Sequence, residues 1–178
     1  MKNLNNLKSL PQDASYAHMP SPVGELIVVT SANGLHAILW EDYAKLPEVK
    51  SIFAKHSEAP NTNMHQQVCQ QLNEYFDGNR KSFDIPIIFD GTVFQNQAWQ
   101  QLQKIPYGET ISYGEQAKRL GDKNKARAVG LANGCNPISI IVPCHRVIGS
   151  NGALTGFGGG LTTKAFLLSL EKANLEKT

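Results

Sequence analysis

The sequence lacks most features that mark secreted, membrane or metal-binding proteins. Its 178 residues contain only three cysteines, Cys69, Cys135 and Cys144, and no pair has the CxxC spacing of a structural zinc site. An odd number of unpaired cysteines favours free thiols in a reducing compartment, so we expect a cytoplasmic protein without disulfides or bound metal. No apolar run is long enough to span a bilayer. Residues 1–14 are polar and lack the apolar segment of a secretory signal, so we expect neither a signal nor a membrane segment.

The chain also has little net charge. Seventeen Lys and Arg residues against fifteen Asp and Glu give a formal charge of +2. This is too small to indicate a polyanionic partner, so any nucleic-acid-binding surface must be local. The length suits one domain or two small ones, and the composition is that of a globular protein.

The first half of the sequence predicts a small sheet with a helix. Residues 24–30 and 35–40 are β-rich runs joined through Asn33-Gly34, which is typical of a hairpin. Residues 63–77 carry apolar side chains at every fourth position and end at a glycine, which predicts a helix. Residues 83–89 predict a further extended segment.

The pattern changes at Asp90-Gly91, where we place a domain boundary. We therefore expect one domain over residues 1–90 and a second over residues 91–178, with an α/β fold overall. The second domain begins with a helix, because Thr92 and Gln95 form a capping box ahead of a buried apolar face. The expected architecture is a small N-terminal sheet-plus-helix domain followed by a mostly helical C-terminal domain.

The C-terminal half contains a candidate helix-turn-helix. One short helix opens at a second predicted capping box, Ser112 with Glu115, and ends at Gly121, while Asp122 can cap the next helix, which runs to about residue 133. Positive charge is concentrated on this pair, at Lys118, Arg119, Lys123, Lys125 and Arg127. From spacing alone, DNA binding and an ordinary pair of packed helices with a solvated face both remain open.

The segment most indicative of chemistry is residues 140–148, Ile-Ile-Val-Pro-Cys-His-Arg-Val-Ile. Its apolar residues predict a strand that places Cys144 at the edge of a core, and Pro143 fixes the backbone before it. The glycine-rich residues 149–160 follow and can approach a ligand closely. A buried cysteine is usually inert, but the neighbouring His145 favours a reachable, reactive thiol.

These residues resemble the active-site signature of the O6-alkylguanine-DNA alkyltransferases, also called methylated-DNA–protein-cysteine methyltransferases. Further blocks appear in the family's order and spacing, so the resemblance is specific from about residue 82 to residue 171. The blocks are Gly108 to Tyr113, Ala126 to Gly130, Asn136-Pro137, Pro143 to Val147, Gly159 to Leu161, and Lys164 with Leu167, Leu168 and Glu171.

The resemblance implies that the protein repairs alkylated double-stranded DNA. The second helix of the helix-turn-helix would enter the minor groove, and its small residues, such as Ala126, suit that narrow space. Arg127 matches the family's arginine finger, which replaces an extruded base in the stack, and Tyr113 matches the tyrosine that helps rotate the nucleotide outward. Ser112, Lys123 and Lys125 are the further residues that we expect to contact DNA.

The resemblance also implies the reaction. Cys144 would accept a methyl or other alkyl group from O6 of guanine, or O4 of thymine, in one irreversible transfer per molecule without a cofactor. A free thiol is mostly protonated at neutral pH and needs a base, which the family supplies through a water-linked relay matching His145 and Glu171. A carboxylate near a helix C-terminus usually has a partner, although a solvated helix end is the alternative for Glu171. Tyr113 would donate to the leaving guanine.

The remaining pocket residues follow the family pattern with two departures. Asn136 matches the asparagine that supports the turn before the active site, and Val147 and Gly159 match pocket positions. Phe157 and Gly158 stand where some relatives have Tyr and Ser, so this chain lacks those two hydroxyls. The resemblance, which is looser before residue 82, implies that residues 1–90 form the family's ribonuclease H-like α/β domain. These residues carry no identifiable chemistry.

Three other interpretations were weighed. A non-catalytic lesion binder would lack the cysteine, which is intact here. A cysteine hydrolase built from Cys144, His145 and Glu171 would usually take its histidine from a distant segment, and it would leave Arg127 without a role. The glycines fit neither phosphate-loop pattern. We expect a monomer with no obligate protein partner.

Overall fold

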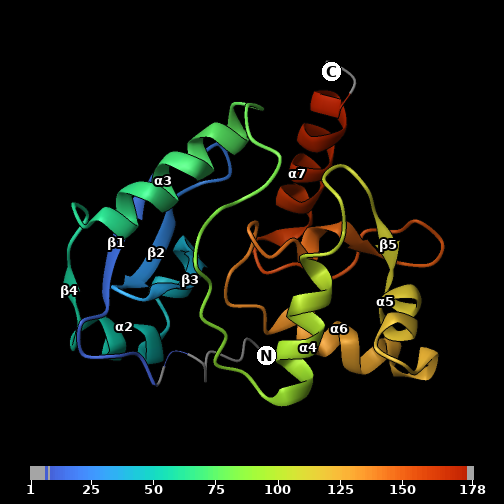
Figure 1. Ribbon diagram of the computed structural model, residues 1–178, viewed down its shortest axis with the longest axis horizontal. Coiled ribbons are helices and arrows are strands. Elements are labelled where there is room, and N and C mark those ends of the chain that lie inside the picture. The colour runs from blue at the N-terminus through green and yellow to red at the C-terminus, as the bar shows by residue number, and fades with distance from the viewer. Residues whose placement is uncertain (1–6, 8, 176–178) are drawn as a thin grey trace. The chain divides into compact units, whose positions relative to one another are not determined.

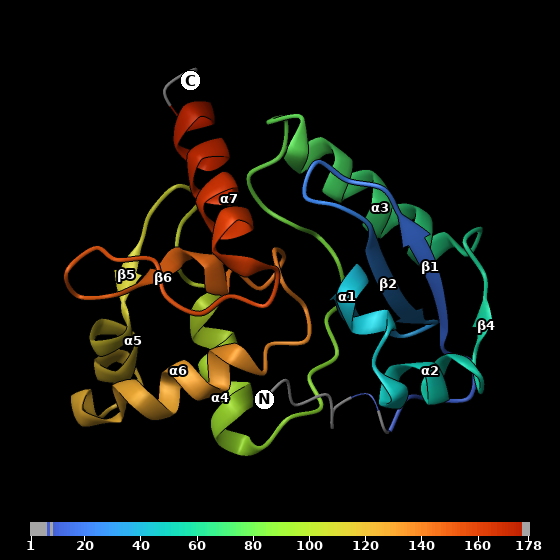
Figure 2. The ribbon, with the colours of Figure 1, turned by 180° about the vertical axis from the view of Figure 1, so that it is seen from behind.

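The structure is a computed structural model that describes residue 7 and residues 9–175. The chain divides into two compact units, with the division between Asp90 and Gly91. Figures 1 and 2 show the elements of both units from opposite sides. Within the described ranges, no helix combines the length and the apolar character needed to cross a bilayer.

The N-terminal unit is built on a four-stranded sheet with the order β3-β2-β1-β4. Strands β2 (Leu26–Ser31) and β3 (Gly34–Trp40) pair antiparallel, so the predicted hairpin is confirmed. Its turn is Ala32-Asn33, one residue earlier than predicted, and Gly34 already pairs with Ser31. The sequence did not indicate the other two strands. Strand β1 (Ser15–Met19) pairs antiparallel with β2, and the two-residue β4 (Ser57–Glu58) pairs parallel with β1.

Three helices accompany this sheet: α1 (Glu41–Ala44), α2 (Pro47–Phe53) and α3 (Asn63–Phe76). The predicted helix over residues 63–77 is confirmed as α3. It starts where the Thr62 hydroxyl accepts a hydrogen bond from the His65 backbone N–H, and it buries Val68 and Leu72 completely. Figure 1 shows α3 lying along the sheet, so the core of this unit lies between them.

Residues 83–89, predicted as an extended segment, do not form a regular strand. They make one isolated parallel bridge, between Ile87 and Leu35 of β3. The Leu35 backbone N–H donates to the Pro86 carbonyl at 2.8 Å, and the Ile88 N–H donates to the Leu35 carbonyl at 3.0 Å. Pro86 has no N–H of its own to extend the ladder. The segment therefore runs beside the sheet without becoming a strand.

The C-terminal unit is mostly helical, which confirms the predicted fold class. Helices α4, α5, α6 and α7 account for most of it, and two short strands pair in parallel beside them. The bounds are α4 (Val93–Leu102), β5 (Ile111–Ser112), α5 (Tyr113–Arg119), the 3-10 helix η2 (Lys123–Lys125), α6 (Ala126–Gly134), the 3-10 helix η3 (Cys144–Arg146), β6 (Val147–Ile148) and α7 (Gly160–Leu175).

Helices α5 and α6 form the predicted helix-turn-helix, and α4 packs against both. The Trp99 indole N–H on α4 donates to the Ala132 carbonyl on α6 at 2.9 Å. Gln116 on α5 and Asn133 on α6 exchange two amide hydrogen bonds, at 2.7 and 3.2 Å. These buried polar contacts fix the helices relative to one another, because each would be costly to leave unmade.

The two predicted capping boxes have different outcomes. The box at Thr92 is complete, with both reciprocal hydrogen bonds present. At Ser112 only one half forms: the Ser112 hydroxyl accepts from the Glu115 backbone N–H at 3.0 Å, but the Glu115 carboxylate pairs with Arg119 instead. The cap still starts α5 at the predicted place.

The segment leading to Cys144 is not the strand that its apolar residues predict. Residues 139–142 turn, Ile140 adopts a φ of 76°, and residues 144–146 form η3. The Asn136 side chain supplies the hydrogen bonds that a neighbouring strand would otherwise give: its amide donates to the Val142 carbonyl and accepts from the Ile138 N–H. The apolar run therefore indicates burial and not a strand, since residues 138–147 are all buried.

Candidate active site

Cys144 is held in a buried turn by the side chain of Asn136. Its thiol accepts a hydrogen bond from the Asn136 amide at 3.2 Å, and the residue is 8% exposed. Burial raises the pKa of the Cys144 thiol, and the Asn136 hydrogen bond and the Lys164 charge oppose this rise only in part. The thiol is therefore neutral at rest and needs a base before it can act as a nucleophile.

His145 and Glu171 form a fully buried pair, both with 0% exposure. The His145 Nε2 atom lies 2.7 Å from Glu171 Oε1. The carboxylate accepts three further hydrogen bonds: from Nε and a terminal nitrogen of Arg146, both at 2.9 Å, and from the Gly108 backbone N–H at 2.9 Å. The alternative of a solvated helix-end carboxylate is wrong for this residue.

The surroundings of Glu171 keep it ionised. Burial by itself raises the pKa of a carboxyl group, but the hydrogen bonds from His145 and Arg146 and the charge of Arg146 outweigh burial and lower the pKa of Glu171 to about 2. A carboxylate with four donors around it is stable in this site despite its position near the end of α7, where the helix dipole opposes it.

The ionised Glu171 fixes the protonation of the His145 ring. Burial lowers the pKa of His145, although its hydrogen bond to Glu171 works in the opposite direction, so the resting imidazole is neutral. Because a carboxylate only accepts, the single ring proton must lie on Nε2. His145 Nδ1 therefore carries a free lone pair, and it is buried without a hydrogen-bond partner among the described residues. It can accept a proton.

No hydrogen bond joins the Cys144 thiol directly to the His145 ring in the described part of the chain. Within η3, Cys144 and His145 are consecutive residues of a tight turn, and the extended geometry expected from the sequence does not apply. The two groups are adjacent along the backbone, but they do not exchange a proton through a direct hydrogen bond in this arrangement.

Three contributors to this site had no assigned role from the sequence. Arg146 is buried, donates to the Ile105 carbonyl at 2.7 Å and lies over the Tyr107 ring. Gly108 donates to Glu171 from a backbone with φ 76°. Lys164 is fully buried on α7 and donates to the Val147 and Thr155 carbonyls at 2.6 and 2.8 Å. Arg146 and Lys164 lie within the sequence blocks that resemble the family, and this was the only sequence feature that pointed to them.

Tyr113, at the start of α5, faces the glycine-rich segment. Its hydroxyl accepts from the Thr155 hydroxyl at 3.2 Å, and Lys164 lies 5.9 Å from the ring centroid. Burial raises the pKa of Tyr113, which keeps the phenol protonated and able to donate. Thr155 thus provides a hydroxyl beside Tyr113 in a loop whose positions 157 and 158 carry none.

Among the predicted pocket residues, Phe157 contacts His145. The Phe157 ring makes an edge contact with the His145 ring, with centroids 6.3 Å apart. Val147 is fully buried in β6, while Gly158 and Gly159 are partly exposed. The glycine-rich segment therefore contacts the buried His145–Glu171 pair through Phe157, and its next two residues are accessible to solvent.

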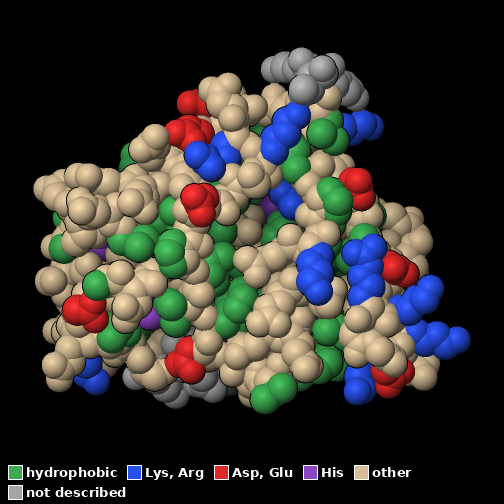
Figure 3. Space-filling view, viewed as in Figure 1, with side chains coloured by type: hydrophobic (Ala, Val, Ile, Leu, Met, Phe, Trp, Pro, Cys, Tyr) green, Lys and Arg blue, Asp and Glu red, His purple; other side chains and the backbone are tan. Residues whose placement is uncertain are grey.

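The residues predicted to contact DNA are on the surface of the helix-turn-helix. Lys123, Lys125 and Arg127 are exposed, and Ala126 is half-buried. Figure 3 shows Lys and Arg side chains gathered over α5 and the segment that joins it to α6. Ser112 and Tyr113 lie at the other end of α5. This local concentration of cations is consistent with a chain of low net charge.

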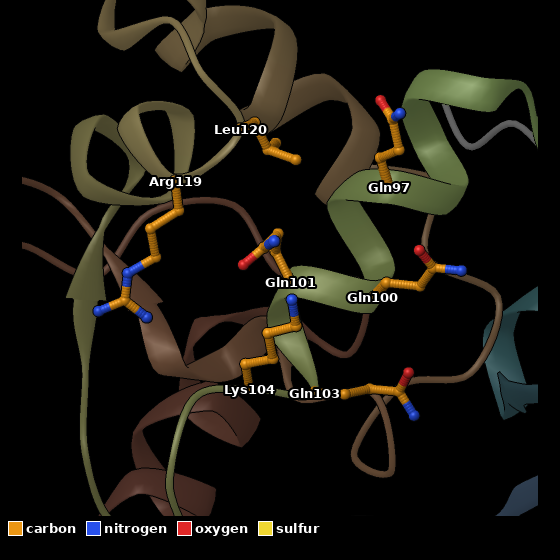
Figure 4. Close-up of a pocket in the computed structure, with 7 residues that line it drawn as sticks. All are labelled: Gln97, Gln100, Gln101, Gln103, Lys104, Arg119 and Leu120. Atoms are coloured by element: carbon orange, nitrogen blue, oxygen red, sulfur yellow. The ribbon is translucent and has the colours of Figure 1, made fainter.

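A hollow of about 630 Å³ lies between α4 and α5, away from the relay. Figure 4 shows the Gln101 side chain on the side of Arg119 and Leu120, whereas Gln100 and Gln103 point to the opposite side. None of the residues of the Cys144 cluster lines it. Among the described residues, no group of three or more His, Cys, Asp or Glu side chains could hold a metal ion.

Both units match known protein families. Residues 93–173 match the DNA-binding domain of 6-O-methylguanine DNA methyltransferase, and residues 15–89 match its ribonuclease-like domain. A methylated-DNA–protein-cysteine methyltransferase of Methanosarcina acetivorans is 46% identical over 156 residues, which cover 88% of this chain and 97% of that protein.

Solved structures agree with this match. The O6-methylguanine methyltransferase of Mycobacterium tuberculosis superposes with a TM-score of 0.81 at 42% identity, covering 90% of this chain and 94% of that one. The M. tuberculosis protein OGT in complex with DNA gives 0.79 at the same identity and the same coverage. The likeness therefore extends over both compact units. The chain belongs to the 6-O-methylguanine DNA methyltransferase family.

Proposed function

We propose that this protein repairs alkylated DNA by transferring a methyl or other alkyl group from O6 of guanine to the sulfur of Cys144. The same chemistry would serve O4 of thymine. The transfer is irreversible, since a thioether is not cleaved by the reactions that reverse thiol oxidation. Each molecule therefore acts once. The reaction requires no cofactor, because the alkyl group comes from the DNA and the acceptor is a side chain.

The observation that carries this proposal is the buried His145–Glu171 pair beside a neutral thiol. Glu171 holds the proton of the neutral imidazole on Nε2, at 2.7 Å, which leaves the Nδ1 lone pair available as a base. Cys144 has a raised pKa, so it needs such a base. A water molecule between the thiol and Nδ1 would complete the relay, since the two groups make no direct hydrogen bond.

In the proposed reaction, the Cys144 thiol gives its proton through water to His145 Nδ1. The thiolate then attacks the alkyl carbon: the S–C bond forms while the C–O6 bond breaks, and the bonding pair stays on the guanine. The imidazolium formed is stabilised by the Glu171 carboxylate. The proton finally neutralises the guanine, so the net change is the exchange of a thiol for a thioether.

Tyr113 is the proposed donor to the leaving guanine. Its raised pKa keeps the hydroxyl protonated, and its position at the start of α5 puts it beside the glycine-rich segment. Asn136 would hold the thiol and the turn, and Val147, Phe157, Gly158 and Gly159 would line the base pocket. Lys164 supports the thiolate, since its charge lowers the pKa of Cys144.

We further propose that α6 enters the minor groove and that the damaged nucleotide is flipped out of the stack. Arg127 would fill the vacated place, and Ser112, Ala126, Lys123 and Lys125 would contact the adjacent backbone. The exposed cations on η2 and α6 and the small residues of α6 support this mode of binding. The protein would act as a cytoplasmic monomer, with residues 91–178 carrying the chemistry and residues 1–90 forming a separate domain.

Intact-protein mass after incubation with a duplex containing O6-methylguanine tests the transfer. The unmodified protein should gain a single methyl group, and peptide mapping should find it on Cys144. The Cys144→Ser variant should gain nothing while still binding DNA, and the Cys69→Ser and Cys135→Ser variants should react normally. No mass change would indicate a lesion binder, and no mass change with peptide turnover would indicate a hydrolase.

The Arg127→Ala variant tests nucleotide flipping. Extruding a base costs a few kcal/mol, and only the duplex substrate carries that cost. The variant should therefore repair the duplex more slowly than the unmodified protein, but it should react normally with free O6-methylguanine base. Equal slowing on both substrates would contradict the proposed role.

A further inference from the structure

Leu131 is an unusually exposed apolar side chain. It lies on α6 and is 75% exposed, more than Leu161, Phe166 or Leu175 elsewhere in this unit. Burying a leucine side chain is worth about 1.5–3 kcal/mol relative to leaving it in water. A leucine held out on a short helix therefore leaves that energy available for a partner.

The surroundings of Leu131 indicate what that partner is. Leu131 follows Arg127 by four residues, so both lie on the same exposed face of α6, opposite the buried Val129 and Ala132. Lys123 and Lys125 precede this face on η2, and α6 itself contains no acidic residue. An apolar protein surface would not match this concentration of cations, whereas a polyanion with an apolar interior would.

We propose that Leu131 is a second residue that α6 inserts into the minor groove, where it packs against sugars and base edges beside the flipped nucleotide. This inference rests on the proposed function. Proteins that bind the minor groove often insert leucine or similar apolar side chains at base steps. Four residues of helix rise about 6 Å, which is close to the length of two base steps. Arg127 and Leu131 thus act at neighbouring points of one groove.

The small residues of α6 permit this approach. Ala128 is exposed beside Arg127, and Gly130, half-buried near the Tyr113 ring, has no side chain. Along the exposed face, Arg127 and Leu131 are therefore the long side chains of α6. A cation and an apolar group together give both attraction to phosphates and exclusion of water from the groove.

Leu131→Ala tests the inference, with Val93→Ala as the matched control. Val93 is 77% exposed and lies at the first turn of α4, so the two variants remove equally exposed apolar groups from one unit. Leu131→Ala should bind an O6-methylguanine duplex about five- to tenfold more weakly, as expected for losing part of an apolar contact. Leu131→Met should restore most of the affinity, and Val93→Ala should match the unmodified protein.

The salt dependence of binding separates an apolar insertion from a phosphate contact. Removing a phosphate-binding cation lowers the slope of log affinity against log salt by about 0.9, because one fewer counterion is released. Lys125→Ala should show that change, whereas Leu131→Ala should weaken binding with its slope unaltered. Reaction of Leu131→Ala with free O6-methylguanine base should be normal.

Several results would overturn the inference. Duplex affinity of Leu131→Ala equal to that of Val93→Ala would overturn it, and so would a slower reaction of Leu131→Ala with free O6-methylguanine base. A change in sedimentation of the DNA-free protein on Leu131→Ala would assign the side chain to a contact between copies instead. Failure of the unmodified protein to acquire a methyl group would contradict the proposed function itself, whereas normal transfer with normal duplex affinity in Leu131→Ala would contradict only this inference.

Discussion

At the scale of single residues, Glu171 has two connected effects. Its carboxylate accepts hydrogen bonds from His145 and Arg146 of η3 and from Gly108, so it joins two separate segments to α7. The same carboxylate selects the His145 tautomer. Because the Glu171 carboxylate both holds these segments and selects the tautomer, its removal should lower the stability of the fold and slow the reaction. The two effects can be measured separately.

We predict that Glu171→Gln slows transfer by about 10²-fold or more, the lower range of general-base contributions. The amide keeps the shape but no longer stabilises the imidazolium, and it can present its N–H₂ to His145 and favour the wrong tautomer. Single-turnover rates with methylated duplex measure the effect. A rate equal to that of the unmodified protein would show that the His145–Glu171 pair is structural only.

The depressed pKa of Glu171 also predicts how stability depends on pH. A carboxyl group whose pKa falls from 4.5 to about 2 on folding stabilises the folded state fully above pH 4.5, and this contribution is lost as pH falls toward 2. The amount is about 3 kcal/mol at 1.36 kcal/mol per unit. Urea unfolding between pH 5 and 2 should show a loss of this size that is missing in Glu171→Gln. If the unfolding free energies of the unmodified protein and Glu171→Gln fall in parallel with pH, this contribution of Glu171 is refuted.

At the scale of elements, Gly108 connects the turn before β5 to the end of α7. Its φ is 76°, and an added Cβ would lie 2.2 Å from Leu175 Cδ1, while its N–H donates to Glu171. A side chain here would disturb both the backbone and the donor. Gly121, in the turn between α5 and η2, has a φ of 95° but open space around it.

Gly108→Ala and Gly121→Ala therefore separate backbone strain from site geometry. Each variant should lose about 1–2 kcal/mol of unfolding free energy for its left-handed backbone. Only Gly108→Ala should also slow transfer, because displacement of its N–H removes one donor from Glu171. Thermal unfolding and single-turnover rates measure the two effects. An equal slowing in Gly121→Ala would show that general destabilisation, not the lost donor, limits the reaction.

The elements that the sequence predicts well are those specified by local chemistry. The hairpin turn at Ala32-Asn33, the Thr92 cap and the Ser112 cap each fix a boundary through groups close together in the chain. Residues 140–146 were misassigned, because an apolar run indicates burial in a turn as well as in a strand. The replacement of strand hydrogen bonds by the Asn136 side chain depends on tertiary contacts.

The candidate site divides in the same way. Cys144 and His145 are adjacent and could be found from the sequence, and Glu171 followed from the family resemblance. Arg146 and Lys164 were visible in motifs, but their roles depend on carbonyls 41, 17 and 9 residues away. No local pattern specifies such distant partners. The same holds for Leu131, whose exposure is known only after α6 is packed.

At the scale of the whole molecule, each unit contains one buried tryptophan and one fully buried histidine. Trp40 and His65 lie in the N-terminal unit, and Trp99 and His145 lie in the C-terminal unit. His65 bridges α3 and the sheet, with its ring 2.7 Å from the Thr62 hydroxyl and 3.1 Å from the Val28 carbonyl. Burial lowers the pKa of His65, against the opposing effect of its backbone hydrogen bonds.

These pairs allow the two units to be followed separately, and we predict that His65→Gln alters only one of them. An unfolded histidine binds a proton near pH 6.5, whereas folded His65 does so only at lower pH, so the N-terminal unit loses stability as pH falls below 6.5. In a Trp99→Phe background, Trp40 fluorescence should report this loss, and His65→Gln should reduce it to the contribution of His36, whose pKa burial also lowers. In a Trp40→Phe background, the Trp99 signal should keep its own dependence on pH, because His145 is unchanged.

Transfer at neutral pH should be equal with and without His65→Gln, since the reacting groups all lie beyond Gly91. If His65→Gln alters the Trp99 signal as strongly as the Trp40 signal, the two units unfold as one.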